Sequence, residues 1–317
     1  MSQTLATILV QAPGLLTTVQ DLGREGFGPM GVSPSGAADA IALRVGNRLV
    51  GNAEGAAGLE MTLLGGTFVF PEGGVLALTG SDFGATLDDA PAPLWASCEV
   101  KPGQTLRLRS TRSGARCYLC VQGGIEVKSF LGSASTHLLS GLGGYEGRAL
   151  RKGDVLRIGP SSEAFWKRAV AAKALERLSP RKILRVTPGP QSDWFPEAVQ
   201  KLFYANTYRV AEESNRMGLR LEGAAITEGA HGKMISEGVS LGAVQIAAGG
   251  LPIILFVEQQ TTGGYAKIAN VISADLSSLG QLRPRDEIRF ERVEFETARA
   301  LLIEQEKLLA SEELILQ

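Results

Sequence analysis

The chain has 317 residues, of which 44% are hydrophobic and 21% are charged, and its formal net charge is −1. Balanced charge argues against a polyanion such as nucleic acid as a partner, and no apolar run approaches the ~20 residues that a membrane helix needs. Because the N-terminus also lacks the basic region of a signal peptide, we expect a cytoplasmic protein with no membrane partner.

Helical periodicity is confined to three segments. Apolar residues recur at helical spacing in 39–52, 163–178 and 296–316, and the last two are the more clearly amphipathic. Ser35 precedes the first segment, so we expect it to be the N-cap, with Asp39 in the first turn near the positive end of the helix dipole. Few helices are therefore expected.

Short strand-like runs between Gly, Pro and Asp turn signals make up most of the rest. This pattern favours β-barrels or sandwiches over a sheet with alternating helices. The clearest runs are GGVLALTG (73–80), QTLRLRS (104–110), RCYLCVQ (116–122), DVLRIG (154–159), GAVQIAA (242–248), LPIILFV (251–257) and DEIRFERV (286–293).

The two halves of the chain share weak matches in the same order, which indicates an internal repeat. The clearest pair is ALRKGDVLRI (149–158) with QLRPRDEIRF (281–290). Other pairs are Glu60 with Glu237, Gly65 with Gly242, Pro13-Gly14 with Pro188-Gly189, and Ser35 with Ser214. The repeat predicts a mainly β protein of two related β-barrel lobes with a pseudo-twofold between them, whose loops converge on a ligand cleft.

The repeat also sets the expected domain boundaries. The helical segment before Ser179-Pro180 is interpreted as a linker between the halves. We expect an N-terminal lobe over 1–160, a helical linker over 161–181, a C-terminal lobe over 182–294 and a C-terminal amphipathic helix over 295–317.

Cys117 and Cys120 form a C-x-x-C, but the sequence does not favour a redox or metal site there. Residues three apart on a strand point to opposite faces, and no second C-x-x-C or nearby His completes a ligand set. The chain has three cysteines and two histidines, His137 and His231, so zinc sites and Ser-His-Asp triads are poorly supported. We predict no metal site and ordinary strand cysteines.

The polar run QTTGGYAK, 260–267, follows a strand-like apolar run and is the strongest candidate for a binding site. Gly263 and Gly264 allow close approach to the backbone, and Lys267 supplies a charge, a combination that suits a carboxylate or phosphoryl oxygen. The alternative is a hairpin whose glycines only make the turn and whose lysine is solvated.

Other charged residues lie at predicted turns. Arg216 and Arg220, four apart, would share one face if their segment were helical, although structural pairing with Glu213 or Glu222 is equally plausible. Asp82 follows a strand-like run. A carboxylate at such a position can act as a general base, but it is more often a turn-former or a paired surface acid.

Together these motifs resemble those of one family, the carboxyltransferase-type proteins named after allophanate hydrolase subunit 2. The resemblance runs from about residue 8 to about residue 292 and departs from the family pattern at Ser33, Ala38, Asn215, Glu258, Gln259 and Ala266. The motifs are GLLTTVQDLGREGFG, SPSGAADAIALRVGNRLVGN, LALTGSD, YLCVQGGIEV, LGSASTHL, SNRMGLRLEG and EQQTTGGYAKIANVISADL.

The resemblance implies cyclophilin-like β-barrel lobes and an enzyme subunit. The implied reaction is the ATP-dependent opening of 5-oxoproline to L-glutamate, with a KipI-type partner and a lactam-utilisation partner. The alternatives are a carboxyltransferase acting on urea or a related amide, with biotin on another chain, and a non-catalytic antagonist of a KipI-type kinase inhibitor. No biotin-attachment lysine and no nucleotide motif is evident, so ATP is expected on a partner or at an interface with one.

The candidate residues follow from these motifs. The catalytic candidates are Lys267 and Arg216 for anion stabilisation, and Glu237 or Asp82 as the acid/base group. The substrate-binding candidates are Arg24, Ser35, Gln260, Thr261, Thr262, Gly263, Gly264 and Tyr265.

Overall fold

The computed structural model describes residues 6–161, 164–229 and 234–316, and it is mainly β with few helices, as the sequence predicts. Among these residues, none of the helices combines the length and the apolar character needed to cross a membrane. The chain forms two compact units that each combine distant segments. Unit 1 is Met1–Arg24, Ser35–Leu178 and Leu309–Gln317, and unit 2 is Glu25–Pro34 and Ser179–Leu308.

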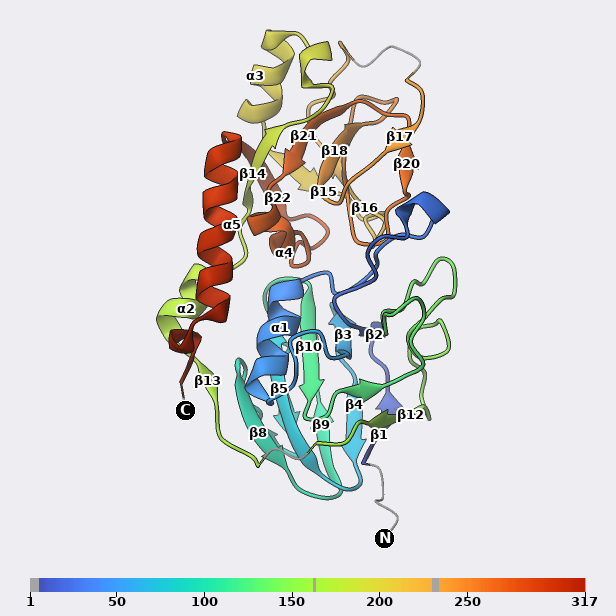
Figure 1. Cartoon of the computed structure of the whole chain (residues 1–317), viewed down its shortest axis with the longest axis vertical. Helices are drawn as coiled ribbons and strands as arrows, with labels where there is room; N and C mark the ends of the chain where they lie inside the picture. Colours follow the sequence, from blue (N-terminus) through green and yellow to red (C-terminus); the bar gives the residue numbers. More distant parts are fainter. Residues whose placement is uncertain (1–5, 162–163, 230–233, 317) are drawn as a thin grey trace. The chain divides into compact units, whose positions relative to one another are not determined.

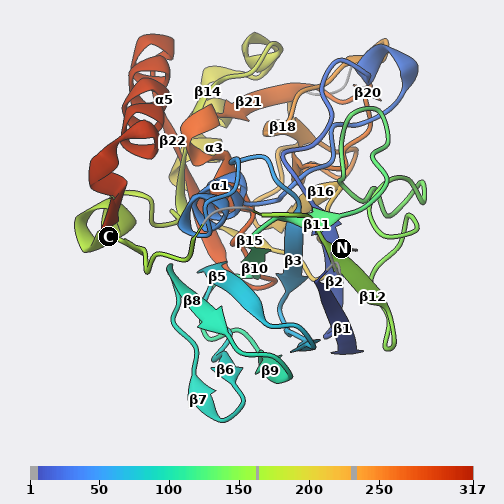
Figure 2. The same ribbon diagram turned by 60° about the horizontal axis from the view of Figure 1, so that its bottom comes forward.

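Unit 1 holds its strands in two seven-stranded sheets rather than in one closed ring (Figure 1). The first sheet has the order β11 (Ile125–Glu126), β12 (Val155–Ile158), β1 (Thr7–Ala12), β4 (Thr67–Phe70), β9 (Gln104–Arg107), β6 (Thr86–Leu87), β7 (Ala90–Pro91). The second has the order β2 (Leu16–Gln20), β3 (Gly58–Thr62), β10 (Arg116–Val121), β5 (Gly74–Gly80), β8 (Ala96–Val100), β13 (Ala169–Val170), β23 (Ile315–Leu316). Figure 2 shows the β6–β7 hairpin beyond β9.

The helix α1 (Ala40–Leu49) covers the face of the second sheet formed by β5 and β10 (Figure 1). Its buried side is the apolar stripe visible in the sequence. Its N-cap is Asp39, whose carboxylate accepts a hydrogen bond from the Ala42 N–H at 3.0 Å, so the expectation for Ser35 is wrong. Ser35 lies before the helix with a φ of 57°, and its hydroxyl donates a hydrogen bond to the Thr136 carbonyl instead of capping the helix.

Gly46 permits the close approach of α1 to the sheet. A Cβ added there would lie 2.7 Å from the Cys120 Sγ and 2.9 Å from the Thr79 Oγ1. Both side chains are fully buried, and the Thr79 hydroxyl donates to the Ala42 carbonyl of the same helix at 2.7 Å. The glycine is therefore required by packing rather than by backbone conformation.

We expect Gly46→Ala to destabilise the protein, although alanine is the better helix former by about 1 kcal/mol. The added methyl must push the helix away from two immobile side chains, an overpacking cost of about 1–3 kcal/mol. Urea unfolding of the variant beside Gly55→Ala, which changes an exposed glycine where a Cβ meets no atom closer than 3.6 Å, would measure the effect. A Gly46→Ala variant as stable as the wild type would contradict this packing argument.

A buried polar cluster lies beneath the start of α1. The Glu60 carboxylate on β3 accepts hydrogen bonds from the Ala38 N–H at 2.8 Å and from the Tyr118 hydroxyl at 2.7 Å. The Arg116 Nε lies 3.3 Å from the other Glu60 oxygen, and the Asp39 N–H donates to the Tyr118 hydroxyl at 2.7 Å. Burial, and next the negative charge of Glu60, raise the pKa of Tyr118 well above its usual value, so the phenol stays neutral.

Unit 2 is built on a closed barrel, as predicted for this half. Its strands, in barrel order, are β14 (Ile183–Pro188), β21 (Lys267–Val271), β18 (Ala243–Ile246), β19 (Pro252–Leu255), β16 (Gly218–Glu222), β15 (Tyr208–Val210) and β22 (Glu287–Arg292). A separate two-stranded antiparallel sheet pairs β17 (Glu237–Gly238) with β20 (Thr262–Gly263). The helices that begin in this unit are α3 (Glu197–Ala205), α4 (Leu276–Leu279) and α5 (Phe295–Ala310).

The segments 149–158 and 281–290, the clearest pair of the sequence repeat, contain the same turn. Asp154 accepts a hydrogen bond from the Arg151 N–H at 2.7 Å, and Asp286 accepts one from the Arg283 N–H at 2.8 Å. In each turn the residue before the aspartate has a left-handed backbone, with a φ of 92° at Gly153 and 71° at Arg285. The turns lead into β12 and β22 respectively.

The early pair of Glu60 with Glu237 does not share an environment. Glu60 is buried in the middle of a three-stranded ladder, whereas Glu237 is exposed on the two-residue strand β17. This match in the sequence therefore does not reflect equivalent positions in the two units.

The Asp154 turn makes a pH-dependent contribution to stability. The guanidinium of Arg148, which forms two hydrogen bonds with the carboxylate at 2.7 and 3.0 Å, lowers the pKa of Asp154. Because the folded pKa lies below the unfolded one, this stability is fully present above the unfolded value, ~3.9, and is lost as the pH falls through the folded value.

We therefore expect Asp154→Asn to lower the free energy of unfolding by about 1–2 kcal/mol at neutral pH. The difference from the wild type should shrink as the pH falls below about 4. Urea unfolding between pH 7 and pH 3 would test this, with the exposed Asp89→Asn as the matched control. A difference that does not change with pH would show that the charge is not responsible.

Two helix predictions are wrong in extent. The segment 163–178 was expected to be one helix, but only α2 (Ala172–Arg177) is helical, and β13 precedes it and pairs with β8 and β23. The C-terminal helix ends at Ala310 and is followed by a short 3-10 turn and β23. In both places pairing with distant strands outweighs the local helical pattern.

Candidate functional site

The polar run at 260–267 contributes β20 to the two-stranded antiparallel sheet β17–β20. It lies between the barrel strands β19 and β21, and β20 pairs with β17 in the register Glu237 with Gly263 and Gly238 with Thr262. Among the residues that the structure describes, β17 and β20 pair with no other strand. The alternative of a hairpin whose glycines make the turn is therefore wrong, because Gly263 lies within β20, whose partner is distant in the sequence, and Lys267 is not solvated.

Lys267 is a buried ammonium with a carboxylate beside it. Its side chain is 4% exposed, and its Nζ lies 2.5 Å from the Glu237 Oε1, on a side chain that is 45% exposed. Gln191 holds both partners: its Nε2 donates to the Glu237 Oε1 at 2.9 Å, and its Oε1 accepts from the Lys267 backbone N–H at 3.1 Å. The contact with Lys267, and next that with Gln191, lower the pKa of Glu237.

A second buried donor lies next to this ion pair. Gln245 on β18 is opposite Lys267 on β21 in the strand register, and it is 1% exposed. Its Nε2 is buried without a hydrogen-bond acceptor among the described residues. A Cβ on Gly263 would lie 2.6 Å from this Nε2, so a side chain at this position would displace the amide. An unmet buried donor costs about 1–3 kcal/mol, which an oxygen-bearing ligand would recover.

Most of the remaining residues of the run are accessible to solvent. Gln260, Thr262, Gly264 and Tyr265 are exposed, and Thr261 is half-buried. The Thr261 carbonyl accepts a hydrogen bond from the Val239 N–H at 3.2 Å, which extends the pairing of β17 with β20 by one residue on each strand. The substrate-binding roles predicted for these side chains remain predictions.

Arg216 belongs to another buried ion pair in unit 2. Its Nε donates to the Glu258 Oε1 at 2.5 Å, and both side chains are buried. The segment is not helical, since Arg220 lies on the strand β16 and is exposed. Arg216 thus has the structural pairing that the sequence left open as an alternative, but with Glu258, whereas Glu222 pairs with Arg209.

Three predicted site residues belong to unit 1, and each has a structural role there. Arg24 donates to the carbonyls of Ser135 and Phe130, and Ser35 donates to the Thr136 carbonyl at 2.7 Å. Asp82 accepts hydrogen bonds from the Gly84 N–H at 2.7 Å and from the exposed Arg112 at 2.9 Å. Asp82 thus has the alternative role that the sequence allows, a turn-former paired at the surface.

The C-x-x-C lies on β10, with its two thiols on opposite faces as predicted. Cys117 packs in the apolar core of unit 1, whereas the Cys120 Sγ lies 3.7 Å from the Leu43 carbonyl of α1. Burial raises the pKa of both thiols far above the usual value, so both are poor nucleophiles and ligands. In the described part of the chain, no three or more His, Cys, Asp or Glu side chains form a cluster that could hold a metal ion.

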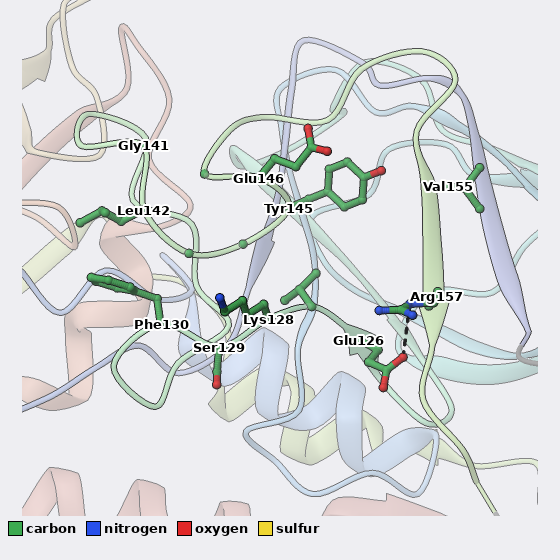
Figure 3. A pocket seen from close by; sticks show the side chains of 14 residues that line it. Glu126, Lys128, Ser129, Phe130, Gly141, Leu142, Tyr145, Glu146, Val155 and Arg157 are labelled. Atoms are coloured by element: carbon green, nitrogen blue, oxygen red, sulfur yellow. Dashed lines mark ion pairs between the residues drawn. The ribbon is translucent and has the colours of Figure 1, made fainter.

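Unit 1 also contains an open cavity of about 540 Å³, a size typical of small-ligand pockets (Figure 3). Figure 3 shows Phe130 and Lys128 on one side, Tyr145 on another and Arg157 beside Glu126, with which it forms an ion pair at 3.5 Å. One wall is the glycine-rich loop 141–147. None of the predicted site residues lines this cavity, and Arg157 already has a counterion. The cavity is therefore a weaker candidate for the functional site than the cluster around Lys267.

The loop before this wall is fixed by a residue that the site prediction omitted. The Asp21 carboxylate accepts hydrogen bonds from the Ser133 hydroxyl and the Ala134 N–H, both at 2.6 Å, and the Gly144 N–H donates to the Ala134 carbonyl. Asp21 and Arg24 therefore support a loop. These hydrogen bonds explain why the motif GLLTTVQDLGREGFG contains Asp21 and Arg24, with no ligand needed.

Comparison with known proteins identifies relatives along nearly the whole chain. A family model described as the carboxyltransferase domain, subdomain A and B, matches residues 30–292. The C component of 5-oxoprolinase from Escherichia coli (strain K12) is 40% identical over 285 residues, which are 90% of this chain and 91% of that protein.

Solved structures agree with these matches. The crystal structure of the K. lactis urea amidolyase superposes with a TM-score of 0.90 at 32% identity, covering 100% of this chain and 21% of that chain. The crystal structure of TTHA0988 gives a TM-score of 0.81 at 36% identity, covering 91% of this chain and 56% of that chain. The chain thus spans little more than half of one of these structures and about a fifth of the other.

Proposed function

The chain belongs to the carboxyltransferase-domain family, subdomain A and B, and we propose that within it the protein is the C component of an ATP-dependent 5-oxoprolinase. The observation that carries this proposal is the end-to-end similarity to the C component of the E. coli enzyme, which covers nearly the full length of both chains. The reaction would open 5-oxoproline to L-glutamate, with a KipI-type protein and a lactam-utilisation protein as partners. The function is assigned to the assembled complex.

The buried Lys267 has the chemistry that an anionic substrate requires. 5-Oxoproline carries a carboxylate beside its lactam amide. A preorganised cation in a water-poor site stabilises such charge more strongly than water does. Lys267 is such a cation, and Gln245, on the adjacent strand of the barrel, adds the neutral donor Nε2. We assign these two groups to the substrate oxygens.

Glu237 is the less suitable choice for the acid/base group. Its lowered pKa keeps it ionised at neutral pH and makes it a weak base, whereas an efficient general base has a pKa near the working pH. We propose that it neutralises Lys267 instead. Arg216, with its own carboxylate partner, is proposed to support the fold.

The cluster does not fit a nucleotide. It offers one ammonium and one amide to a ligand, whereas a triphosphate with its magnesium needs a cradle of backbone N–H groups and several charged contacts. The proposal therefore places ATP on a partner protein or at an interface with one, and assigns to this chain the binding of the organic substrate.

The experiment is reconstitution of this chain with the KipI-type and lactam-utilisation proteins. Glutamate formed from 5-oxoproline would be measured with and without ATP, and with each chain omitted in turn. We expect turnover only with all three chains and ATP. A parallel assay with urea and a biotin carboxylase tests the second candidate, which the likeness to urea amidolyase favours. Turnover of urea alone, or tight partner binding without any turnover, would overturn the proposal.

A further inference from the structure

The carboxylate that meets Lys267 in this structure belongs to the protein itself. Glu237 reaches the buried ammonium from a two-residue strand and remains about half exposed, whereas Lys267 is almost fully covered. Only one of the two partners is therefore fixed inside the barrel. The exposed partner can turn toward water at little cost, because its charge is then solvated.

The buried partner cannot lose its counterion so easily. An ammonium left in a low-dielectric site without an anion carries a large desolvation penalty. A ligand that displaces Glu237 must therefore bring a negative charge of its own. A neutral amide such as urea does not meet this condition, whereas a lactam that carries a carboxylate does.

Gln245 adds a directional contact that Glu237 leaves unused. Its buried Nε2 has no acceptor in the described residues, although it lies on the strand next to Lys267. Gly263 brings no side chain against this nitrogen, from which an added Cβ would lie only 2.6 Å away. A carboxylate has two oxygens, so one can meet the ammonium and the other the amide.

We propose that Lys267 and Gln245 bind the carboxylate of a carboxylated lactam, and that Glu237 holds this position until the ligand replaces it. The inference rests on the proposed function and deepens it, because it makes a free carboxylate the feature by which the substrate is selected. Exchange of one carboxylate for another keeps the buried ammonium neutralised throughout. Glu237 is then an internal competitor of the substrate.

The test uses calorimetric binding to the full chain and KM in the assembled complex. The probes are 5-oxoproline, 2-pyrrolidinone, which has the same ring without the carboxylate, and acetate, which has the carboxylate without the ring. We expect 5-oxoproline to bind and 2-pyrrolidinone not to bind. Competition by acetate would identify the carboxylate itself as the recognised group, and its failure to compete at any concentration would overturn the proposal.

Two variants separate competitor from ligand-binding residue. Glu237→Gln should lower the dissociation constant, or KM, for 5-oxoproline by about tenfold, because the competing charge is gone. Gln245→Leu should raise it by about tenfold, because one hydrogen bond to a charged group is lost. Glu222→Gln, which breaks the exposed pair with Arg209, is the matched control and should change neither value. Thermal unfolding of each variant confirms that it is folded.

The outcomes separate this inference from the proposed function. Unchanged or weaker binding in Glu237→Gln would overturn the inference even in a complex that hydrolyses 5-oxoproline. A second outcome is a complex that does not turn over 5-oxoproline but whose carboxylate-dependent binding becomes tighter in Glu237→Gln. That outcome would support the inference and overturn the proposed function. If the isolated chain binds none of the three probes, KM in the assembled complex decides: an unchanged KM for 5-oxoproline in both variants overturns the inference.

Discussion

Replacing Lys267 with methionine should lower kcat/KM of the assembled complex for 5-oxoproline by about a hundredfold, with the complex still formed. The variant loses charge-assisted hydrogen bonds of about 1.5–3 kcal/mol in total, and each 1.36 kcal/mol is a factor of about ten in rate. Methionine has a similar length and is apolar, so it can fill the buried position. Glu237, which loses its partner, is about half exposed and can be solvated.

Lys201→Met is the matched control for this change. Lys201 lies on α3 in the same unit and pairs with Glu197 at 2.7 Å, but both side chains are exposed. We expect that variant to keep the wild-type kcat/KM, since exposed ion pairs contribute little. Co-purification of the partner proteins measures assembly. A Lys267→Met chain that no longer assembles would assign the cluster to a partner interface, as expected for a non-catalytic antagonist.

Much of the architecture could be predicted because it depends on local patterns. The apolar stripe of α1 and the turn before β12, which recurs before β22, are read directly from spacing and turn residues. The failures occur where distant strands decide the structure. Ala169–Val170 forms a strand because β8 and β23 lie beside it, although its own neighbourhood has helical periodicity.

The candidate site was predictable only in part for the same reason. Lys267 could be selected because a charge beside two glycines at a strand end is a local signal. Gln191 could not, because it is 76 residues from Lys267 and 46 residues from Glu237 in the chain. Gln245 shows no signal as an isolated amide on an apolar strand, and its unmet donor is visible only in three dimensions. Arg216 was selected together with Arg220, but Arg216 is buried before β16, whereas Arg220 is exposed on that strand.

The largest expected effect on stability comes from Glu60→Leu in unit 1. This change removes the buried carboxylate that the Arg116 guanidinium faces and the acceptor of the Tyr118 hydroxyl and the Ala38 N–H. Removing one partner of a buried charged pair costs about 3–5 kcal/mol, because the other charge stays in the interior. We expect that loss in the free energy of unfolding, measured by urea denaturation with circular dichroism.

Two further variants identify the cause of that loss. Glu222→Leu, at the exposed pair with Arg209, is the same substitution on a surface strand and should cost about 0–1 kcal/mol. Glu60→Leu combined with Arg116→Met should regain part of the lost stability, because the buried guanidinium that faced this carboxylate is then removed as well. A double variant as unstable as Glu60→Leu alone would show instead that the hydrogen bonds of Tyr118 and Ala38, which hold the start of α1, account for most of the contribution of Glu60.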